Sequence, residues 1–412
     1  MDIFDKFSTL QSRTDLVNRL GVDPFGVKFD DITNATRGRI GNRSIVLAGT
    51  NNYLGLTFDP DCMDASINAI KNYGTGTTGS RIANGSYTGH VDLEDALAKH
   101  AGMASAIIFS TGYQTNLAAI ATLAGPKDVL FIDADSHACI IDGCRLSAAP
   151  TIRFRHNSPS DLDKRLTRHN NSEGKIDGGI ALVVIEGLYS MFGDRAPIAE
   201  FVDVCKKHGA YLYIDEAHSF GVFGSTGCGL AEEEGVLDQV DFISGTFSKS
   251  LASIGGFCLS KHKGFEITRK AMRAYMFTAS PTPSNVAAAR AALDKIAEKP
   301  ELRDNLRDRG LQLHKGLTEL GFDLCGPPGP IIAVRRPNEV VAATEWNWLL
   351  EEGVYVNLAV PPGTPQSSSL LRISLSAAHT KDDINIILKA FKDMQGQGEA
   401  LMAKVQAVMA TG

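Results

Sequence analysis

A lysine lies just beyond a predicted buried strand. Residues 240–244 are mostly apolar and favour a short strand, and Lys249 follows it. Burial there would strip water from the amine and lower its pKa, so that it could act as a nucleophile or hold a carbonyl group. Thr246 and Ser248 add hydroxyl and backbone N–H groups that suit a phosphate. Most lysines are solvated surface residues, so Lys249 alone does not define a site.

A second strand, upstream, ends at a carboxylate. Residues 210–214 form an apolar, partly aromatic run that stops at Asp215, with His218 close behind. A carboxylate at one strand end and a lysine at the next fit a pyridoxal 5′-phosphate (PLP) site. Lys249 would hold the aldehyde, and Asp215 would keep the pyridine nitrogen protonated, so that the ring can accept electrons. The alternative is a turn-capping Asp215 and an ordinary buried His218; together with Lys249 we favour the cofactor.

Strand-like and helix-like segments alternate through the middle of the chain. Seven segments favour strands, and helical patterns separate most of them. They are residues 106–109, 129–133, 151–154, 180–186, 211–215, 242–244 and 256–260. This pattern predicts an α/β fold with an open, mostly parallel seven-stranded sheet, in which ligands bind beyond the carboxyl ends of the strands.

Polar residues follow several of these strands. A turn after the first strand carries Gly112 and Tyr113 into a helix, whose N-terminal N–H groups and dipole suit a phosphate. His137 follows the second strand and could either stack on a flat ring or be a polar residue of a helix-capping turn. Ser190 follows the fourth strand and could reach a ring hydroxyl. Together these strand ends predict one shared cofactor site.

The rest of the chain is arranged around this region. Residues 1–45 form an N-terminal appendage whose apolar spacing indicates packing on the body or on a second subunit, with a membrane-surface helix as the alternative. We assign residues 46–285 to a large PLP-binding α/β domain and residues 286–412 to a small C-terminal α+β domain. The strand candidates of the small domain are residues 330–334, 354–359 and 371–376. Arg372 is a cation inside the last of them, so it needs a carboxylate, either internal or from a substrate.

The composition fits a soluble globular enzyme. Of 412 residues 43% are hydrophobic and 21% charged, which is ordinary, and the net charge of −6 gives no reason to expect nucleic acid. No apolar run is long enough for a transmembrane span, and the first residues are unlike a signal peptide. The 7 cysteines are scattered with no Cys-x-x-Cys pair, which predicts free thiols in a reducing cytoplasm and no metal site.

These motifs together resemble a known family. The sequence is similar to the α-oxoamine synthases, PLP enzymes with the aspartate-aminotransferase fold (fold type I), over nearly the whole chain. The matching segments are residues 51–55, 215–219, 248–249, 371–372 and 379–380. Residues 186–191, 245–250 and 277–280 look most like bacterial members that use L-serine, whereas relatives with other substrates tend to have Gly or Ala where this chain has Ser248.

Carried over by position, the resemblance implies a role for each site residue. The implied catalytic residues are Lys249, His137, Asp215 and His218. The implied cofactor-binding residues are Gly112, Tyr113, His137, Ser190, Asp215, His218, Thr246, Ser248, Lys249 and, from a second subunit, Thr278. The implied substrate-binding residues are Asn52, His137 and Arg372. A site shared between chains implies a homodimer. Some bacterial members carry a second arginine shortly before Arg372, and residues 361–370 hold none.

The activity that the resemblance implies is a PLP-dependent, decarboxylating condensation of L-serine with a long-chain acyl thioester such as palmitoyl-CoA. It gives 3-ketodihydrosphingosine, CoA and CO2, the first step of sphingolipid synthesis, and a lipid product suggests peripheral membrane contact. The nearest alternative joins glycine or alanine to another acyl-CoA, as in 8-amino-7-oxononanoate synthase or glycine C-acetyltransferase. An aminotransferase would release no CoA. A non-catalytic partner subunit could lack the lysine, so Lys249 and Asp215 count against it.

Overall fold

The computed structural model describes residues 2–171 and 178–410. By the contacts between residues, the chain divides into two compact units. The first unit holds Met1–Tyr53, Ser190–Gly193 and Asp304–Gly412, and the second holds Leu54–Tyr189 and Asp194–Arg303. The domain boundaries proposed above (1–45, 46–285 and 286–412) stay a prediction.

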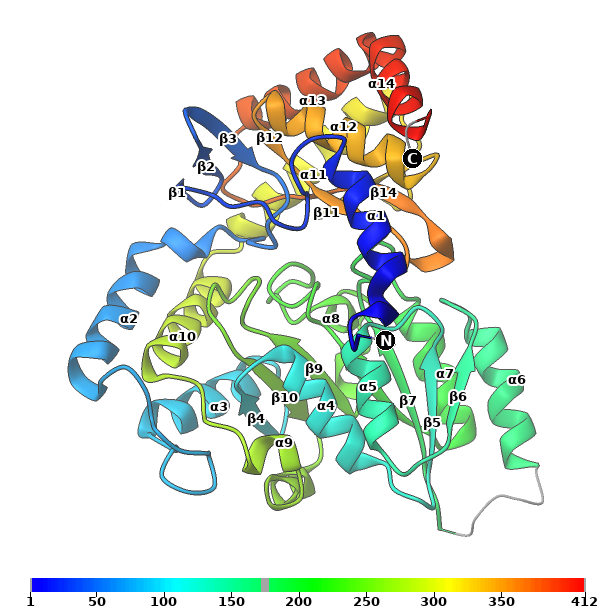
Figure 1. Cartoon of the computed structure of the whole chain (residues 1–412). Coiled ribbons are helices and arrows are strands. Elements are labelled where there is room, and N and C mark those ends of the chain that lie inside the picture. The colour runs from blue at the N-terminus through cyan, green and yellow to red at the C-terminus, as the bar shows by residue number, and fades with distance from the viewer. Residues whose placement is uncertain (1, 172–177, 411–412) are drawn as a thin grey trace. The chain divides into compact units, whose positions relative to one another are not determined.

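The second unit contains a seven-stranded sheet (Figure 1). The strand order is β4-β10-β9-β8-β7-β5-β6. The strands are β4 (Ser105–Phe109), β5 (Val129–Asp133), β6 (Thr151–Phe154), β7 (Ala181–Glu186), β8 (Tyr211–Asp215), β9 (Phe242–Thr246) and β10 (Gly256–Ser260). Only β10 pairs antiparallel with its neighbours, whereas the other pairs are parallel. The seven predicted strands and the mostly parallel sheet are confirmed.

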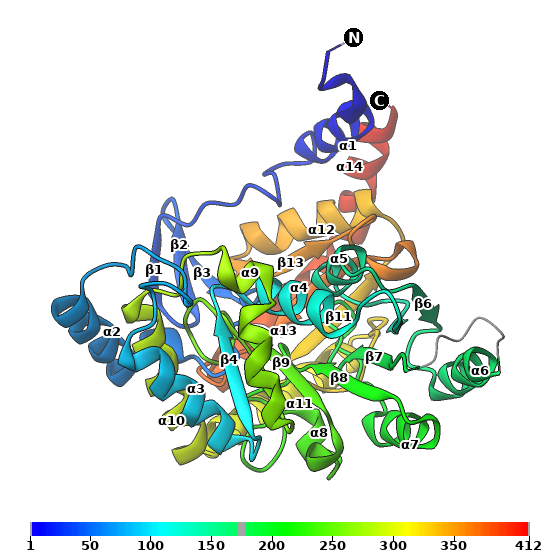
Figure 2. The ribbon, with the colours of Figure 1, turned by 90° about the horizontal axis from the view of Figure 1, so that it is seen from below.

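Helices precede, follow and connect these strands. They are η2 (Leu56–Phe58), α2 (Pro60–Tyr73), α3 (Thr88–His100), α4 (Gly112–Leu123), α5 (Ala138–Leu146), α6 (Pro159–Asn170), α7 (Ile198–His208), α8 (Leu230–Glu233), η3 (Leu237–Gln239), η4 (Lys263–Lys270), α9 (Arg273–Met276) and α10 (Pro283–Glu298). Helices α2 and α3 both pack on α10 (Figure 2), and α4 packs on α5.

Both faces of the sheet are buried at its central strands, which is why these strands are continuous apolar runs in the sequence. Leu130 and Ile132 of β5 pack in a cluster with residues of α4 and α5. Phe131, between them, points to the other face, where its ring lies 5.8 Å from that of His169 in α6. Each fully buried aliphatic side chain contributes about 1.5–3 kcal/mol of hydrophobic stabilisation, so the strand ends rest on a rigid core.

The first unit contains two smaller sheets. One has the order β1-β2-β3-β12 and the other β11-β14-β13. The strands are β1 (Asp31–Asn34), β2 (Arg37–Ile40), β3 (Arg43–Leu47), β11 (Ile331–Arg336), β12 (Val354–Tyr355), β13 (Asn357–Ala359) and β14 (Ser369–Ser374). The helices are η1 (Asp5–Phe7), α1 (Ser8–Asn18), α12 (Glu339–Glu351), η5 (Pro365–Ser367), α13 (Lys381–Gly396), α14 (Gly398–Ala410) and the part of α11 (Glu301–Glu319) from Asp304 onward. Among the described residues, no helix is both long and apolar enough to cross a membrane.

The strands of the first unit differ from the sequence-based prediction in two places. Residues 1–45 were predicted only as an appendage, and no strand was predicted there, but residues 31–47 form β1–β3, with Gly41 at φ +59° in the turn between β2 and β3. Residues 354–359 were expected to be one strand, but they form two, because the chain passes from one sheet to the other at Val356. Nε1 of Trp346 donates to the carbonyl of Val356 at 2.7 Å and fixes this crossing.

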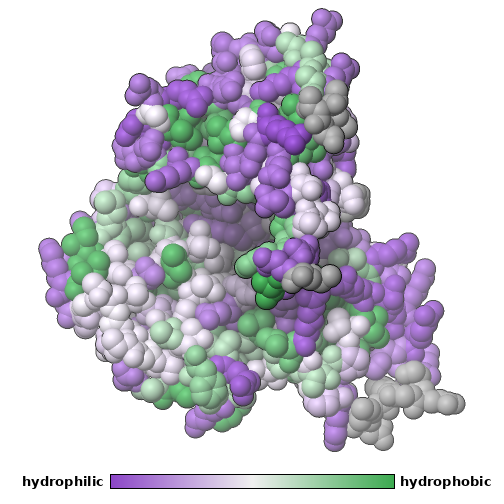
Figure 3. Space-filling model, in the orientation of Figure 1, coloured by the Kyte–Doolittle hydropathy of each residue, from purple (hydrophilic) through white to green (hydrophobic). Residues whose placement is uncertain are grey.

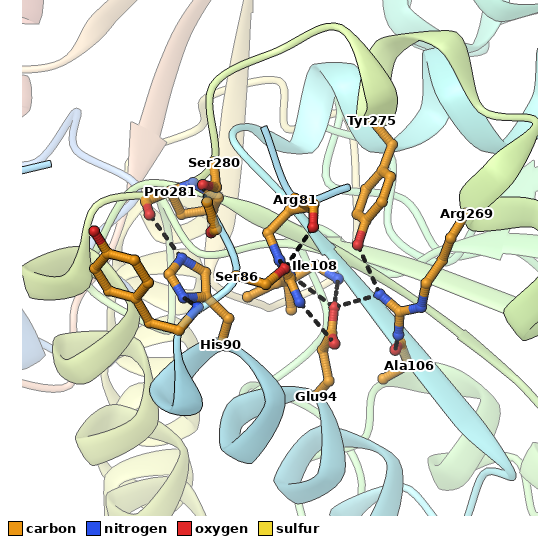
Figure 4. A network of polar contacts seen from close by, with 12 residues as sticks. Arg81, Ser86, His90, Glu94, Ala106, Ile108, Arg269, Tyr275, Ser280 and Pro281 are labelled. Atoms are coloured by element: carbon orange, nitrogen blue, oxygen red, sulfur yellow. Dashed lines mark hydrogen bonds and ion pairs between the residues drawn. The ribbon is translucent and has the colours of Figure 1, made fainter. Parts of the chain in front are cut away.

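A buried ion network ties α3 to β4 and to the neighbouring loops (Figure 4). Glu94 accepts hydrogen bonds from both terminal nitrogens of Arg81, at 2.9 and 3.1 Å, and from Nη1 of Arg269 at 2.9 Å. It also accepts from the backbone N–H of Ile108 at 2.9 Å. Glu94 is 5% exposed, so its removal would leave two guanidinium groups without their shared counter-charge in a poorly solvated site.

We expect Glu94→Ala to lower the free energy of unfolding by about 3–5 kcal/mol, because breaking a buried ion pair leaves an uncompensated charge. Glu266→Ala is the matched control. Glu266 pairs with the same Arg269, but its side chain is 49% exposed, so its loss should cost less than about 1 kcal/mol. Urea denaturation of both variants measures the difference, and equal small losses would contradict the role given to the network.

Candidate active site at the carboxyl ends of the strands

The register of three parallel strands brings polar residues to one edge of the sheet. Glu186 at the end of β7 pairs with Asp215 at the end of β8, which pairs in turn with Ser244 of β9. A cavity of about 370 Å³ lies at this edge. The predicted site residues among its lining are Gly112, Tyr113, His137, Asp215, His218, Thr246, Ser248 and Lys249. The structure therefore brings these residues together, and their individual roles stay predictions.

Asp215 is fixed by two donors. Nδ2 of Asn116, in α4, donates to Oδ2 of Asp215 at 2.6 Å, and the N–H of Ala217 donates to Oδ1 at 2.9 Å. Oδ1 of Asn116 accepts from the hydroxyl of Tyr213 at 2.8 Å. Asn116 was not singled out in the sequence, although a buried polar residue on an apolar helix was a usable signal.

Glu186 is a second carboxyl group at this edge and was also not singled out. Its Oε1 accepts from the backbone N–H of His137 at 2.6 Å. Burial raises the pKa of Glu186 well above its usual range, and the negative charge of Asp215 raises it further. Burial thus favours the protonated form of Glu186, which reduces the repulsion between the two adjacent carboxyl groups.

His137 caps the N-terminus of α5. Its Nδ1 accepts from the backbone N–H of Cys139 at 3.2 Å, and its ring meets that of Tyr113 edge-on at 6.3 Å. Burial lowers the pKa of His137; Asp215 acts in the opposite direction and Lys249 lowers it further. The ring is therefore neutral near pH 7, and a neutral, fixed ring is suited to lie against a flat cofactor.

The N-terminus of α4 provides a polar cradle. Thr111 caps the helix by accepting from the N–H of Gln114 at 3.2 Å, whereas the first helical N–H groups have no partner within the helix. Oγ1 of Thr246 and Oγ of Ser248 lie 2.8 Å apart beside it. A Cβ atom at Gly112 would come within 2.7 Å of Cβ of Thr246, so only glycine allows this close approach. These donors fit a phosphate, and with Lys249 and Asp215 they make a donor set that fits PLP.

The first unit brings Arg372 and Ser190 together. Nε of Arg372 donates to the backbone carbonyl of Ser190, and its Nη1 donates to Oγ of Ser374 at 2.7 Å. Oδ1 of Asn51, the residue before Asn52, lies 3.3 Å from Nη2. Arg372 is 5% exposed, yet within the described ranges it takes part in no ion pair. The internal carboxylate considered from the sequence is therefore not found there.

An ion cluster, which was not predicted, ties the loop after β7 to the end of β5. Nδ1 of His156 lies 2.8 Å from Oδ1 of Asp133, and its Nε2 lies 2.7 Å from Oδ2 of Asp194. Burial alone would lower the pKa of His156, but the two carboxylates raise it to about 10. His156 is thus an imidazolium near pH 7 and holds the end of the loop whose tip contains Ser190.

The chain is similar to known proteins in both sequence and fold. The sequence matches the family "Aminotransferase class I and II" over residues 43–391. It is 50% identical to the serine palmitoyltransferase of Caulobacter vibrioides (strain NA1000 / CB15N) over 395 residues, which cover 96% of each chain. It superposes on the solved Sphingomonas wittichii serine palmitoyltransferase with a TM-score of 0.92 and 45% identity, covering 98% of this chain and 100% of the other. A serine palmitoyltransferase solved with a PLP internal aldimine gives a TM-score of 0.92 at 43% identity, covering 97% and 99%.

The His156 cluster predicts a pH dependence of stability. The pKa of His156 in the fold, about 10, exceeds the ordinary value of about 6.5, so its stabilisation is complete below pH 6.5 and lost as the pH rises through 10. We expect the wild-type protein to exceed His156→Gln in free energy of unfolding by an amount that shrinks between pH 6.5 and 10. Denaturant titrations across this range measure it, and a difference independent of pH would rule out a charged His156.

Proposed function

The chain belongs to the class I and II aminotransferase family and, within it, to the α-oxoamine synthases, and we propose that it condenses L-serine with a long-chain acyl thioester such as palmitoyl-CoA. The products are 3-ketodihydrosphingosine, CoA and CO2. The cofactor is PLP. The observation that carries the proposal is the single cavity that holds Lys249, Asp215 and His137 beside the N-terminus of α4. The likeness to serine palmitoyltransferases over nearly the whole chain supports the choice of substrates.

The cavity residues bind the cofactor at three points. The N-terminal N–H groups of α4, at Gly112 and Tyr113, and the hydroxyls of Thr246 and Ser248 would hold the phosphate. Asp215, with its orientation fixed by Asn116, would pair with the pyridine nitrogen and keep its proton in place. The resemblance assigns the ring hydroxyl to Ser190 and to His218, and His218 lines the same cavity.

Lys249 provides the base for the reaction. Bound PLP supplies an electron-accepting ring that stabilises negative charge at the α-carbon of serine. Nζ of Lys249 takes the α-proton, and the α-carbon then forms a bond to the thioester carbonyl carbon while the C–S bond breaks and CoA leaves. The bond from the α-carbon to the carboxyl group breaks next, CO2 departs, and Lys249 returns a proton to the α-carbon. The reaction thus needs no oxidant or reductant.

Arg372, His137 and Asn52 are assigned to the serine carboxylate. Arg372 is buried with neutral oxygen partners from Ser190, Ser374 and Asn51, so a substrate carboxylate would supply the counter-charge. Burial raises the pKa of the neighbouring Tyr53 to about 12, despite the opposite effect of Arg372, so this phenol does not supply an anion. The missing second arginine leaves Arg372 as the main cation proposed for this role.

A homodimer with shared sites is part of the proposal. Thr278 is assigned to the phosphate of the other subunit, and within the described chain it does not line the cavity but accepts from Nε2 of Gln114 at 3.3 Å. Phe277 beside it is 74% exposed. Met63, Ile67 and Ile70 of α2 are also exposed, and their spacing places them on one face of the helix. Figure 3 shows hydrophobic surface where Figure 1 has α2. Exposed apolar groups of this kind support a contact with a second copy.

The location of the protein is also proposed from its side chains. No disulfide joins the cysteines that the structure describes, and all but Cys325 are buried, which supports a reducing compartment such as the cytoplasm. Ile3, Phe4, Phe7 and Leu10 near the N-terminus are exposed, which supports peripheral contact with a membrane as the source of the acyl substrate.

We expect the purified protein with PLP to release CoA from palmitoyl-CoA only when L-serine is present, and to release CO2 in equal amount. Thiol detection and 14CO2 from carboxyl-labelled serine measure the two products. Glycine and L-alanine, tested in parallel, serve as controls. A faster reaction with either would move the protein to a sister α-oxoamine synthase, and turnover without CoA release would favour an aminotransferase.

We expect Arg372→Ala to reduce kcat/KM for serine by about 10- to 150-fold, mostly through KM, because a charge-assisted hydrogen bond contributes about 1.5–3 kcal/mol. Arg335→Ala is the matched control, since Arg335 lies on the neighbouring strand β11 and pairs with the exposed Asp323. Initial rates at varied serine measure both. A KM for serine that changes less than twofold in Arg372→Ala would contradict this assignment.

A further inference from the structure

A continuous chain of hydrogen bonds links Asp215 to His137. Nδ2 of Asn116 donates to Oδ2 of Asp215 at 2.6 Å and to Sγ of Cys139 at 3.1 Å. The sulfur in turn lies 2.8 Å from Nδ1 of His137. All four residues line the same cavity. Cys139 is therefore the link between the carboxylate proposed for the pyridine nitrogen and the ring proposed to lie on the cofactor.

The position of each proton in this chain follows from its neighbours. The amide of Asn116 has two hydrogens, and Asp215 and Cys139 each take one. The oxygen of this amide accepts from the hydroxyl of Tyr213, which fixes the orientation of the amide. The sulfur of Cys139 thus accepts from Asn116, and its own hydrogen is free to be donated to His137.

Nδ1 of His137 must be an acceptor. The backbone N–H of Cys139, which can only donate, lies 3.2 Å from Nδ1. A neutral imidazole with an acceptor at Nδ1 carries its hydrogen at Nε2. The surroundings keep both groups neutral: burial lowers the pKa of His137, and burial followed by the charge of Asp215 raises the pKa of the Cys139 thiol. The ring then presents an N–H donor at Nε2.

We propose that Cys139 is a positioning residue, which donates its S–H to Nδ1 of His137 and thereby locks the imidazole in the tautomer that offers Nε2–H to the substrate carboxylate. This inference rests on the proposed function. It adds to it the reason why His137 acts as a neutral donor, and it connects the orientation of His137 to that of Asp215 through Asn116. Deleting the thiol leaves the backbone N–H as the remaining donor to Nδ1.

The alternative is that Cys139 only fills space in the core, as buried cysteines often do. Cys144 offers a matched control, because it lies on the same helix, is equally buried, and joins the apolar cluster beside the sheet without lining the cavity. Serine at position 139 keeps a donor of similar size, whereas alanine removes it. A space-filling role predicts similar effects of alanine at 139 and 144, and a positioning role does not.

The direct test is a two-bond 1H–15N spectrum of the holoenzyme labelled with [15N]histidine, with the His137 signals assigned by their loss in His137→Gln. We expect the wild type to show Nε2–H with an unprotonated Nδ1. In Cys139→Ala we expect the pKa of His137 to rise by about 0.5–1 unit, because a donor to the neutral ring is lost. Cys139→Ser and Cys144→Ala should match the wild type. Glu186, Asp215 and Lys249 line the same cavity, and the charges of Asp215 and Lys249 also shift the pKa of His137. The titration is therefore repeated after removal of PLP, which separates the effect of the cofactor on this pKa from that of the thiol.

Kinetics give the second readout. We expect Cys139→Ala to raise KM for serine about 3- to 10-fold with PLP affinity within twofold of wild type, and Cys139→Ser to restore KM. A wild-type ring protonated at Nδ1, or a Cys139→Ala protein with unchanged titration and KM, would overturn the proposal. The spectrum needs no turnover, so it stands if another amino acid proves to be the substrate. If the wild-type protein turns over serine while Nδ1 of His137 carries the proton, the role of Cys139 is wrong and the proposed function still holds.

Discussion

The register between β7, β8 and β9 is the constraint on which the candidate site depends. It places Glu186 beside Asp215, and Asp215 beside the start of the segment that leads to Lys249. Each of these strands is buried on both faces, and a slip of one residue in the pairing would move every side chain of the strand to the opposite face of the sheet. The hydrophobic core therefore fixes the distance between the lysine and the carboxylate, although neither contributes to that core.

The charges at this edge follow from the same geometry. Two carboxyl groups at adjacent strand ends cannot both be charged cheaply, and burial favours the neutral form of Glu186 by raising its pKa. Glu186 accepts a hydrogen bond from the backbone N–H of His137, and Asn116 orients Asp215. In the other unit, the charge of Arg372 meets neutral oxygens among the described residues. The second unit thus holds Asp215 in a fixed orientation, and the first unit holds Arg372 buried without an ion pair among the described residues.

The parts of the fold that were visible in the sequence are those set by local pattern. Most of the seven strands are short apolar runs, and Lys249, Asp215 and His137 lie at or soon after the ends of such runs, so their convergence could be inferred from parallel topology alone. Strands β1–β3 were missed because they are short, and they alternate weakly on a sheet that is partly exposed. The split of residues 354–359 depends on which strand each half pairs with, and one strand's sequence does not contain that information.

The residues of the site that were missed share a physical reason. Asn116, Glu186 and His156 act through contacts with residues far away in the sequence, so no spacing rule could reveal them. Cys139 was seen only as one scattered cysteine, because its meaning comes from two neighbours that the fold supplies. Polar residues at strand ends and on apolar helices were the available signal in the sequence for these supporting groups.

We propose that Lys249 holds PLP in the cavity that it shares with Asp215. Borohydride reduction of the purified holoenzyme, followed by protease digestion and mass spectrometry, locates the lysine that carries the cofactor. We expect a pyridoxyl group on the peptide that contains Lys249, and none in Lys249→Ala. A pyridoxyl group on another lysine of the wild-type protein, or a protein that takes up no PLP, would contradict it.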